Sequence, residues 1–240
     1  MLKAIADVYS GSGGRPNNED SYLCEEFVWA VADGLGGHNG SEYASALAVN
    51  ELTVQCCKNF NPTEAWMKST VLRINQKILD AQDSDPSVRD MRTTFTAAFL
   101  KSENLSYISI GDTRLYLFRD GKIDCLTHDD SAAALMLKNK HIKGDVRESP
   151  ARNMLNRTLG DPKNSTPRDE NCASLQVKPG DALLLCTDGF WDYVYETEML
   201  IDYAKSTSPS EWLHYMLKRL FRRAPNGHDN LTAVCVMLQM

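Results

Sequence analysis

The chain has 240 residues, 42% of them hydrophobic, and a formal net charge of −6 at pH 7. This length and apolar content suffice for a buried core, and we expect one domain spanning residues 1–240. The acidic balance excludes the basic surface by which nucleic-acid-binding proteins attract phosphates, so no nucleic-acid partner is expected.

The cysteines and the lack of apolar segments narrow the class of protein further. Seven cysteines, an odd number without a CxxC pair, favour reduced and mostly buried thiols over a disulfide framework or a zinc site. The N-terminus lacks the apolar stretch of a signal peptide, and no segment approaches the ~20 apolar residues of a membrane span. We therefore expect a cytoplasmic monomer without membrane insertion.

Strand and helix patterns occur in separate blocks along the chain. The first block predicts strands at 2–9, 21–24 and 27–33, followed by helices at 41–59 (with Ser41 as N-cap) and 63–82. The second predicts strands at 93–101, 104–110, 113–119 and 122–126, with a hairpin turn at 119–122. The third predicts strands at 173–178 and 181–187, helices at 196–206 and 209–223, and a strand at 231–238. Clustered strands and consecutive helix pairs indicate an α+β fold, with antiparallel sheets covered by helices.

Residues 127–172 differ from the rest of the chain. They combine a helix-like stretch, Ser131–Lys140, with polar sequence that contains Pro and Gly. A long irregular segment of this kind is typical of a surface insertion, and we predict a flap at about 132–172.

Acidic residues recur at the ends of the predicted apolar strands. These positions are Glu19 with Asp20, Asp33, Asp112, Asp188 and Asp229. A single Asp-Gly pair is usually a turn, because Asp bonds its own backbone and Gly supplies a positive φ. Repetition at one strand end after another instead predicts carboxylates gathered at one edge of a sandwich, where divalent cations would relieve their repulsion.

The donor types indicate which metal is bound. All candidates are oxygen donors, and no His or Cys pair at ligand spacing accompanies them, which favours Mg²⁺ or Mn²⁺ over Zn²⁺. The glycine after Asp33 would leave the Gly34 carbonyl free to reach a metal and would let a substrate approach.

Other phosphate-handling sites fit this sequence poorly. In a dinucleotide fingerprint Gly34 and Gly36 would fit, but the third glycine position is Asn39. The Gly121-Lys122 pair lacks the Ser or Thr of a Walker motif, and no kinase HRD motif or cysteine-phosphatase loop is present.

Eight collinear motifs resemble those of one enzyme family over residues 7–238, and they are RPNNED, VADGLGGHNGSEYAS, TTFTAAFL, SIGDTRLYLFRDGK, LTHDDS, LNRTLGD, GDALLLCTDGFWDYV and HDNLTAVCV. The chain is similar to the bacterial branch of the type 2C, metal-dependent serine/threonine protein phosphatases, the PPM family. The resemblance implies a four-layer α-β-β-α sandwich with two antiparallel sheets, helix pairs on both faces, and a centre of two Mn²⁺ or Mg²⁺ ions at one end.

The resemblance also implies roles for individual residues. Asp33 would bridge both ions; Asp188 and Asp229 would complete the first site, Glu19 and the Gly34 carbonyl the second, with Asp20 holding bound water and Asp112 serving a weaker third ion. Arg15 would grip the substrate phosphate. Catalysis would then be direct attack on phosphorus by a hydroxide that bridges the two ions.

The chain departs from the family pattern at two places. Leu35 stands where eukaryotic members carry a histidine thought to protonate the leaving group, and we interpret the nearby His38 as a turn residue. Arg92 stands where a glycine usually precedes Thr93. Trp191 and Tyr193 are predicted to pack rather than to contact substrate.

The predicted function is hydrolysis of phosphoserine and phosphothreonine in proteins, with a Ser/Thr kinase and its substrates among the partners. Two alternatives stay open: a non-catalytic regulatory module of the same fold, and a phosphatase of narrow specificity for one partner. Retention of all the acidic positions favours the enzyme.

Overall fold

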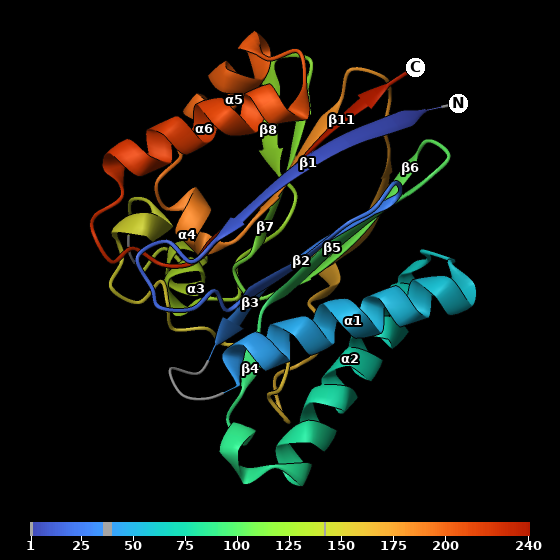
Figure 1. Cartoon of the computed structure of the whole chain (residues 1–240), viewed down its shortest axis with the longest axis vertical. Coiled ribbons are helices and arrows are strands. Elements are labelled where there is room, and N and C mark those ends of the chain that lie inside the picture. Colours follow the sequence, from blue (N-terminus) through green and yellow to red (C-terminus); the bar gives the residue numbers. More distant parts are fainter. Residues whose placement is uncertain (1, 36–39, 142) are drawn as a thin grey trace.

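The computed structural model describes residues 2–35, 40–141 and 143–240. Two β-sheets stack face to face, and a pair of helices covers the outer face of each sheet (Figure 1). This arrangement confirms the four-layer α-β-β-α sandwich that the sequence predicts.

The strands divide between two antiparallel sheets. In the first sheet the order is β1 (Lys3–Gly11), β11 (Leu231–Gln239), β10 (Ala182–Cys186), β7 (Arg114–Arg119) and β8 (Lys122–Cys125). In the second it is β2 (Asp20–Cys24), β3 (Val28–Leu35), β5 (Phe95–Lys101), β6 (Asn104–Ile110) and β9 (Cys172–Gln176), and the short β4 (Arg92–Thr93) pairs with the end of β3. Each sheet therefore combines strands from distant parts of the chain.

Strand β3 shows how the sequence specifies the layers. Its successive side chains point to opposite faces of the sheet. Val28 and Ala30 belong to the core under the helices, while Trp29 and Val31 belong to the core between the two sheets. A central strand buried on both faces is apolar throughout, and this one carries its first carboxylate, Asp33, only near its end.

Helix pairs α1 (Ser41–Asn59) with α2 (Glu64–Ser84) and α5 (Glu196–Lys205) with α6 (Pro209–Arg223) form the outer layers. Helix α6 begins where the Ser208 hydroxyl accepts a hydrogen bond from the Glu211 N–H, with proline in its first turn. Trp212, Met216 and Leu220, spaced by four residues, form its buried face against the first sheet.

Three local expectations need correction. The predicted strand 93–101 is two strands, because Thr94 leaves the sheet between β4 and β5 and its N–H donates to the Asp33 carbonyl. Ser41 is the first residue of α1 and not its N-cap, which is Gly40 at φ 116°. The short helix α4 (Asp188–Trp191) was not predicted.

The segment 127–172 contains helix α3 (Ala132–Lys138), the 3₁₀ turns η2 (Val146–Glu148) and η3 (Asp169–Asn171), and irregular loops. A further 3₁₀ turn, η1 (Pro86–Val88), follows α2. The helix expected at Ser131–Lys140 is therefore present and slightly shorter, with Ser131 as its N-cap. The role of this segment as a flap stays a prediction.

All seven cysteines are free, although only Cys172, Cys186 and Cys235 are buried, so the prediction of mostly buried thiols is wrong for the other positions. None of the helices in the described part of the chain is both long and apolar enough to cross a membrane.

Candidate active site

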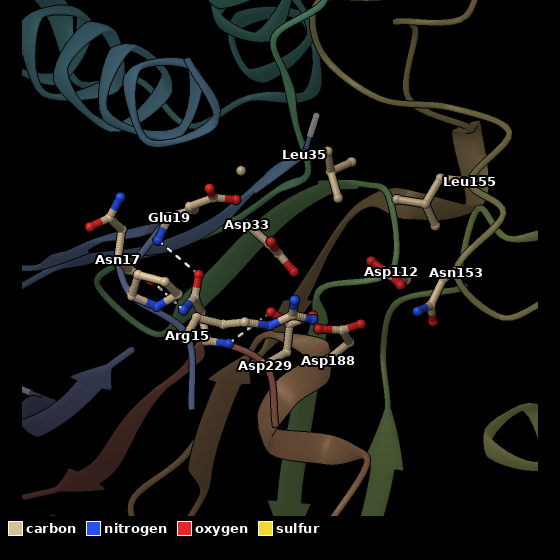
Figure 2. Close-up of a pocket in the computed structure, with 13 residues that line it drawn as sticks. Arg15, Asn17, Glu19, Asp33, Leu35, Asp112, Asn153, Leu155, Asp188 and Asp229 are labelled. Atoms are coloured by element: carbon tan, nitrogen blue, oxygen red, sulfur yellow. Dashed lines mark hydrogen bonds and ion pairs between the residues drawn. The ribbon is translucent and has the colours of Figure 1, made fainter. Parts of the chain in front are cut away.

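A cavity of about 400 Å³ opens at one end of the sandwich. Figure 2 shows the carboxylates of Asp33, Asp188 and Asp229 near its centre, with Glu19 on one side and Asp112 on the other. Every predicted site residue lines this cavity except Asp20, so the structure brings Arg15, Glu19, Asp33, Gly34, Asp112, Asp188 and Asp229 together.

Two threonines fix the backbone of Asp33. The Asp33 N–H donates to the Thr94 hydroxyl at 3.0 Å, and the Asp33 carbonyl accepts from the Thr94 N–H at 2.9 Å and from the Thr93 hydroxyl at 2.9 Å. These bonds take over where the pairing of β3 with β5 stops, at Val31. Asp33 is thus held in place beyond the end of the regular ladder.

Gly34 has a packing role that the sequence analysis did not anticipate. A Cβ at this position would lie 2.3 Å from the Ser41 carbonyl oxygen and 2.7 Å from that of Glu19. Glycine therefore allows β3 to pass close to β2 and to the start of α1. The interpretation that glycine lets a ligand approach is not needed to explain its presence here.

Asn230, to which the sequence analysis gave no role, organises the N-terminal side of the cavity. Its side-chain carbonyl accepts from the Glu19 N–H at 2.8 Å. Its amide donates to the carbonyls of Ser12 at 2.9 Å and Asn17 at 2.8 Å. Its position directly after Asp229, in the motif HDN, was the available signal.

Arg15 reaches across the cavity to Asp229, with 3.1 Å between the guanidinium and the carboxylate (Figure 2). The two side chains are 53% and 47% exposed, so the ion pair contributes only ~0–1 kcal/mol. The guanidinium can therefore exchange this carboxylate for another anion at little cost.

Asp112 precedes β7 and Asp188 follows β10, and these two strands are neighbours in the first sheet. Asp188 is the first residue of α4, directly after β10, and Asp112 lies in the turn between β6 and β7. That turn requires Gly111, at φ 101°, where a Cβ would lie 2.6 Å from the Thr94 methyl carbon.

The carboxyl groups raise one another's pKa. Burial, together with repulsion from Asp20 and Asp188, holds the pKa of Asp33 well above its usual range. Burial followed by the charges of Asp192 and Asp229 raises the pKa of Asp188 to about 6. Burial, followed by the charge of Asp188, also holds the pKa of Asp112 well above its usual range. Among the described residues that line the cavity, the carboxyl groups thus outnumber the one guanidinium, that of Arg15.

Asp20 lies behind the cavity. One of its carboxylate oxygens accepts hydrogen bonds from the hydroxyls of Thr187 at 2.9 Å and Thr232 at 2.7 Å. The other oxygen is buried and has no hydrogen-bond partner in the described part of the chain. Burial raises the pKa of this carboxyl to about 7.

The donor set fits divalent cations bound by oxygen. Arg15 is the one cationic side chain among the described residues that line the cavity, so the acidic cluster calls for further positive charge. Among the described residues no group of three or more acidic, histidine or cysteine side chains is already arranged to hold an ion. Side-chain rotations would therefore accompany binding.

The two departures from the family pattern, and the nearby His38, have different outcomes. Leu35 lines the cavity, and its apolar side chain offers no proton. His38 lies outside the described residues. Arg92 is accommodated without glycine, because its side chain turns away to pair with Asp161 at 3.0 Å while its backbone continues β4.

Comparison with known proteins gives a consistent result. The family model described as protein phosphatase 2C matches residues 17–224. The chain is 29% identical over 231 residues to "Serine/threonine phosphatase stp" of Listeria monocytogenes serotype 4b, covering 94% of this chain and 88% of the relative. It is 29% identical over 222 residues to "Serine/threonine protein phosphatase PstP" of Mycobacterium tuberculosis, covering 92% of this chain and 42% of that longer protein.

Solved structures agree with the sequence relatives. The catalytic domain of PstP, in complex with two manganese ions, superposes with a TM-score of 0.87 at 28% identity, and the match covers 100% of both chains. The likeness thus extends over all four layers of the sandwich.

Proposed function

The chain belongs to the protein phosphatase 2C family, and from this premise we propose that it hydrolyses phosphoserine and phosphothreonine in proteins. The observation that carries the proposal is the single cavity in which an arginine and a cluster of carboxylates from both sheets meet. The relatives named above as serine/threonine phosphatases support it.

We propose that the carboxylates hold a pair of Mn²⁺ or Mg²⁺ ions, with Asp33 between them. Asp188 and Asp229 would serve one ion, Glu19 and the Gly34 carbonyl the other, with Asp20 acting through water and Asp112 serving a weaker third ion. The two manganese ions in the complex of the PstP catalytic domain support the proposal of a metal pair. Ions bound there would lower the pKa of coordinated water and so would supply the hydroxide that we propose as the nucleophile.

The protein side chains would then bind and orient the substrate. Arg15, freed from Asp229, would donate two hydrogen bonds to phosphate oxygens, which suits its planar fork. Thr93 and Thr94 keep Asp33 in position during the reaction. Leu35, an apolar residue that lines the cavity, cannot protonate the leaving group.

We further propose that residues 1–240 act as one catalytic domain, in which residues 132–172 form a flap that shapes access to the cavity. Asn153 and Leu155 of this segment line the cavity, which supports the proposal. Its partners would be phosphorylated proteins, including a Ser/Thr kinase and its substrates.

The experiment is hydrolysis of an aryl phosphate and of several unrelated phosphopeptides, with Mn²⁺ and with EDTA. We expect activity that requires metal and that falls by at least about 10²–10³-fold in Asp33→Asn. Asp83→Asn, at an exposed position on α2, is the matched control and should keep the activity of the wild type.

Activity that survives EDTA or Asp33→Asn would overturn the mechanism. Folded protein that neither binds Mn²⁺ nor hydrolyses any substrate would identify a non-catalytic regulatory module. Cleavage of one phosphopeptide alone would identify an enzyme of narrow specificity.

A further inference from the structure

Trp191 is buried beneath the cavity, at the end of the helix that carries Asp188. It is 1% exposed, and its indole N–H donates to the backbone carbonyl of Asp112 at 3.0 Å. The bond thus joins two carboxylate-bearing segments, α4, which follows β10, and the turn between β6 and β7. Packing alone, the role predicted from the sequence, would not require this contact.

Two arginines hold the indole ring from outside the cavity. The guanidinium carbon of Arg114 lies 3.6 Å from the ring centroid, and that of Arg147 lies 5.4 Å from it. A desolvated cation over an indole face is attracted to the ring. The Trp191 ring is therefore restrained by charged groups as well as by apolar contacts.

Both arginines are themselves anchored. Arg114 makes two hydrogen bonds to Asp129, at 3.0 and 2.8 Å. Arg147 donates to the Trp191 carbonyl at 2.9 Å and to Glu196 at 2.8 Å. Because Arg147 belongs to the segment 132–172, this segment fixes the ring from the side away from the sheet.

The turn that carries Asp112 is also held on its other side. The Asp130 N–H donates to the Gly111 carbonyl at 2.8 Å, and the Gly111 N–H donates to the Asp130 carboxylate at 3.2 Å. Asp130 thus fixes the residue before Asp112, whereas Trp191 fixes the carbonyl of Asp112 itself. Loss of the indole N–H would leave that buried carbonyl free to turn.

We propose that Trp191, braced by Arg147, is a positioning residue that sets the affinity of the divalent-cation site to which Asp112 contributes. The inference rests on the proposed function, since that function makes Asp112 a metal ligand. Trp191 would act on the site through the Asp112 backbone, without touching metal or substrate.

Trp191→Phe tests the proposal, because phenylalanine keeps an aromatic ring and removes only the donor and part of the surface. Trp212→Phe is the matched control: Trp212 is fully buried in the same helical layer, and its indole N–H donates to the Met199 carbonyl at 3.1 Å, away from the cavity. The measurements are thermal unfolding in EDTA and Mn²⁺ titration by calorimetry. Asp112→Asn identifies which Mn²⁺ site is involved.

Both tryptophan variants should unfold a few degrees lower than the wild type, roughly 2–4 °C for each lost kcal/mol in a chain of this size. Trp191→Phe should weaken Mn²⁺ at the Asp112 site by about tenfold, the effect of one hydrogen bond of ~1.4 kcal/mol, and Trp212→Phe should leave it unchanged. Arg147→Lys keeps the charge but loses the planar guanidinium that donates to both the Trp191 carbonyl and Glu196. It should weaken Mn²⁺ binding at the same site by a smaller factor.

Unchanged Mn²⁺ affinity in Trp191→Phe, or equal weakening in Trp212→Phe, would overturn the inference and leave Trp191 a packing residue. If Trp191→Phe does not fold, unchanged affinity in Arg147→Lys would overturn it. A wild-type protein that binds no Mn²⁺ at all would instead overturn the proposed function, and the inference with it.

Discussion

Thr94 connects Asp33 to the interior of the sandwich through its hydroxyl. This hydroxyl accepts from the Asp33 N–H at 3.0 Å and lies 2.5 Å from the Thr113 hydroxyl. Thr96, two residues along, makes comparable bonds to Ser109 at 2.7 Å and to the Thr113 carbonyl at 2.8 Å, but none to Asp33. The two threonines therefore form a matched pair.

Replacing either threonine by valine should destabilise the protein by about 1–3 kcal/mol, because each change leaves buried polar groups without a partner. Only Thr94→Val should also weaken Mn²⁺ binding, by about tenfold, since only this change removes the acceptor of the Asp33 N–H. Denaturant unfolding and Mn²⁺ titration of both variants separate the two effects. Equal Mn²⁺ affinity in the two variants would show that the hydroxyl has no positioning role.

The sequence indicated the carboxylates but not the groups that hold them. Asp-Gly pairs at the ends of apolar strands form a recognisable local pattern, and Asp33 and Asp188 were found in this way. One of the two hydroxyls that donate to Asp20 belongs to Thr232, 212 residues further along the chain. Threonines and asparagines are common in every context, so nothing local distinguishes Thr232 or Asn230 before the fold brings them to the site.

At the scale of secondary structure, Gly160 connects the segment 132–172 to helix α2 through hydrogen bonds. Its φ is 87°, and an added Cβ would lie 2.5 Å from the Met91 carbonyl oxygen. Its N–H donates to Asn75 at 2.8 Å and its carbonyl accepts from Gln82 at 3.0 Å, both on α2. Gly180 has almost the same φ, 88°, with nothing within 4 Å of its Cβ position.

Alanine at Gly180 should cost about 1–2 kcal/mol, the penalty of a left-handed backbone for an L-residue. Alanine at Gly160 should cost more, because the Cβ would also push against a backbone oxygen. Chemical denaturation gives both values. Equal losses would mean that the loop around Gly160 shifts freely, and that the segment is not rigidly fastened there.

Long elements were predictable because their apolar periodicity repeats several times. The helix expected at 41–59 matches α1 to the residue, and 209–223 matches α6. Helix α4 has only four residues, too few for any period to show. The strand expected at 93–101 is divided because Thr94 bonds to Asp33, a tertiary contact that overrides a continuous β-pattern.

The candidate site exists only in the complete sandwich. Asp33 and Glu19 belong to the second sheet and its entry loop, whereas Asp188 and Asp229 adjoin strands of the first. A divalent ion among these carboxylates would therefore link the two sheets. Besides its proposed role in catalysis, it would stabilise the folded state.

The buried carboxyls lead to a pH dependence of stability that bound metal should oppose. The pKa of Asp20 is raised to about 7 and that of Asp188 to about 6, both chiefly by burial. Without metal, the folded state holds protons that the unfolded chain releases near pH 4. The stability from these carboxyls is thus fully present below about pH 4 and is lost as the pH rises toward 7.

In EDTA, the melting temperature should therefore be lower at pH 8 than at pH 5.5, by an amount corresponding to a few kcal/mol. Mn²⁺ binds the ionised carboxylates, so it should raise the melting temperature more at pH 8 than at pH 5.5. Asp20→Asn removes one of the shifted groups and should flatten the profile in EDTA. Greater stability at pH 8 than at pH 5.5 in EDTA would mean that the folded protein compensates this charge without metal, and that the acidic cluster does not require a cation.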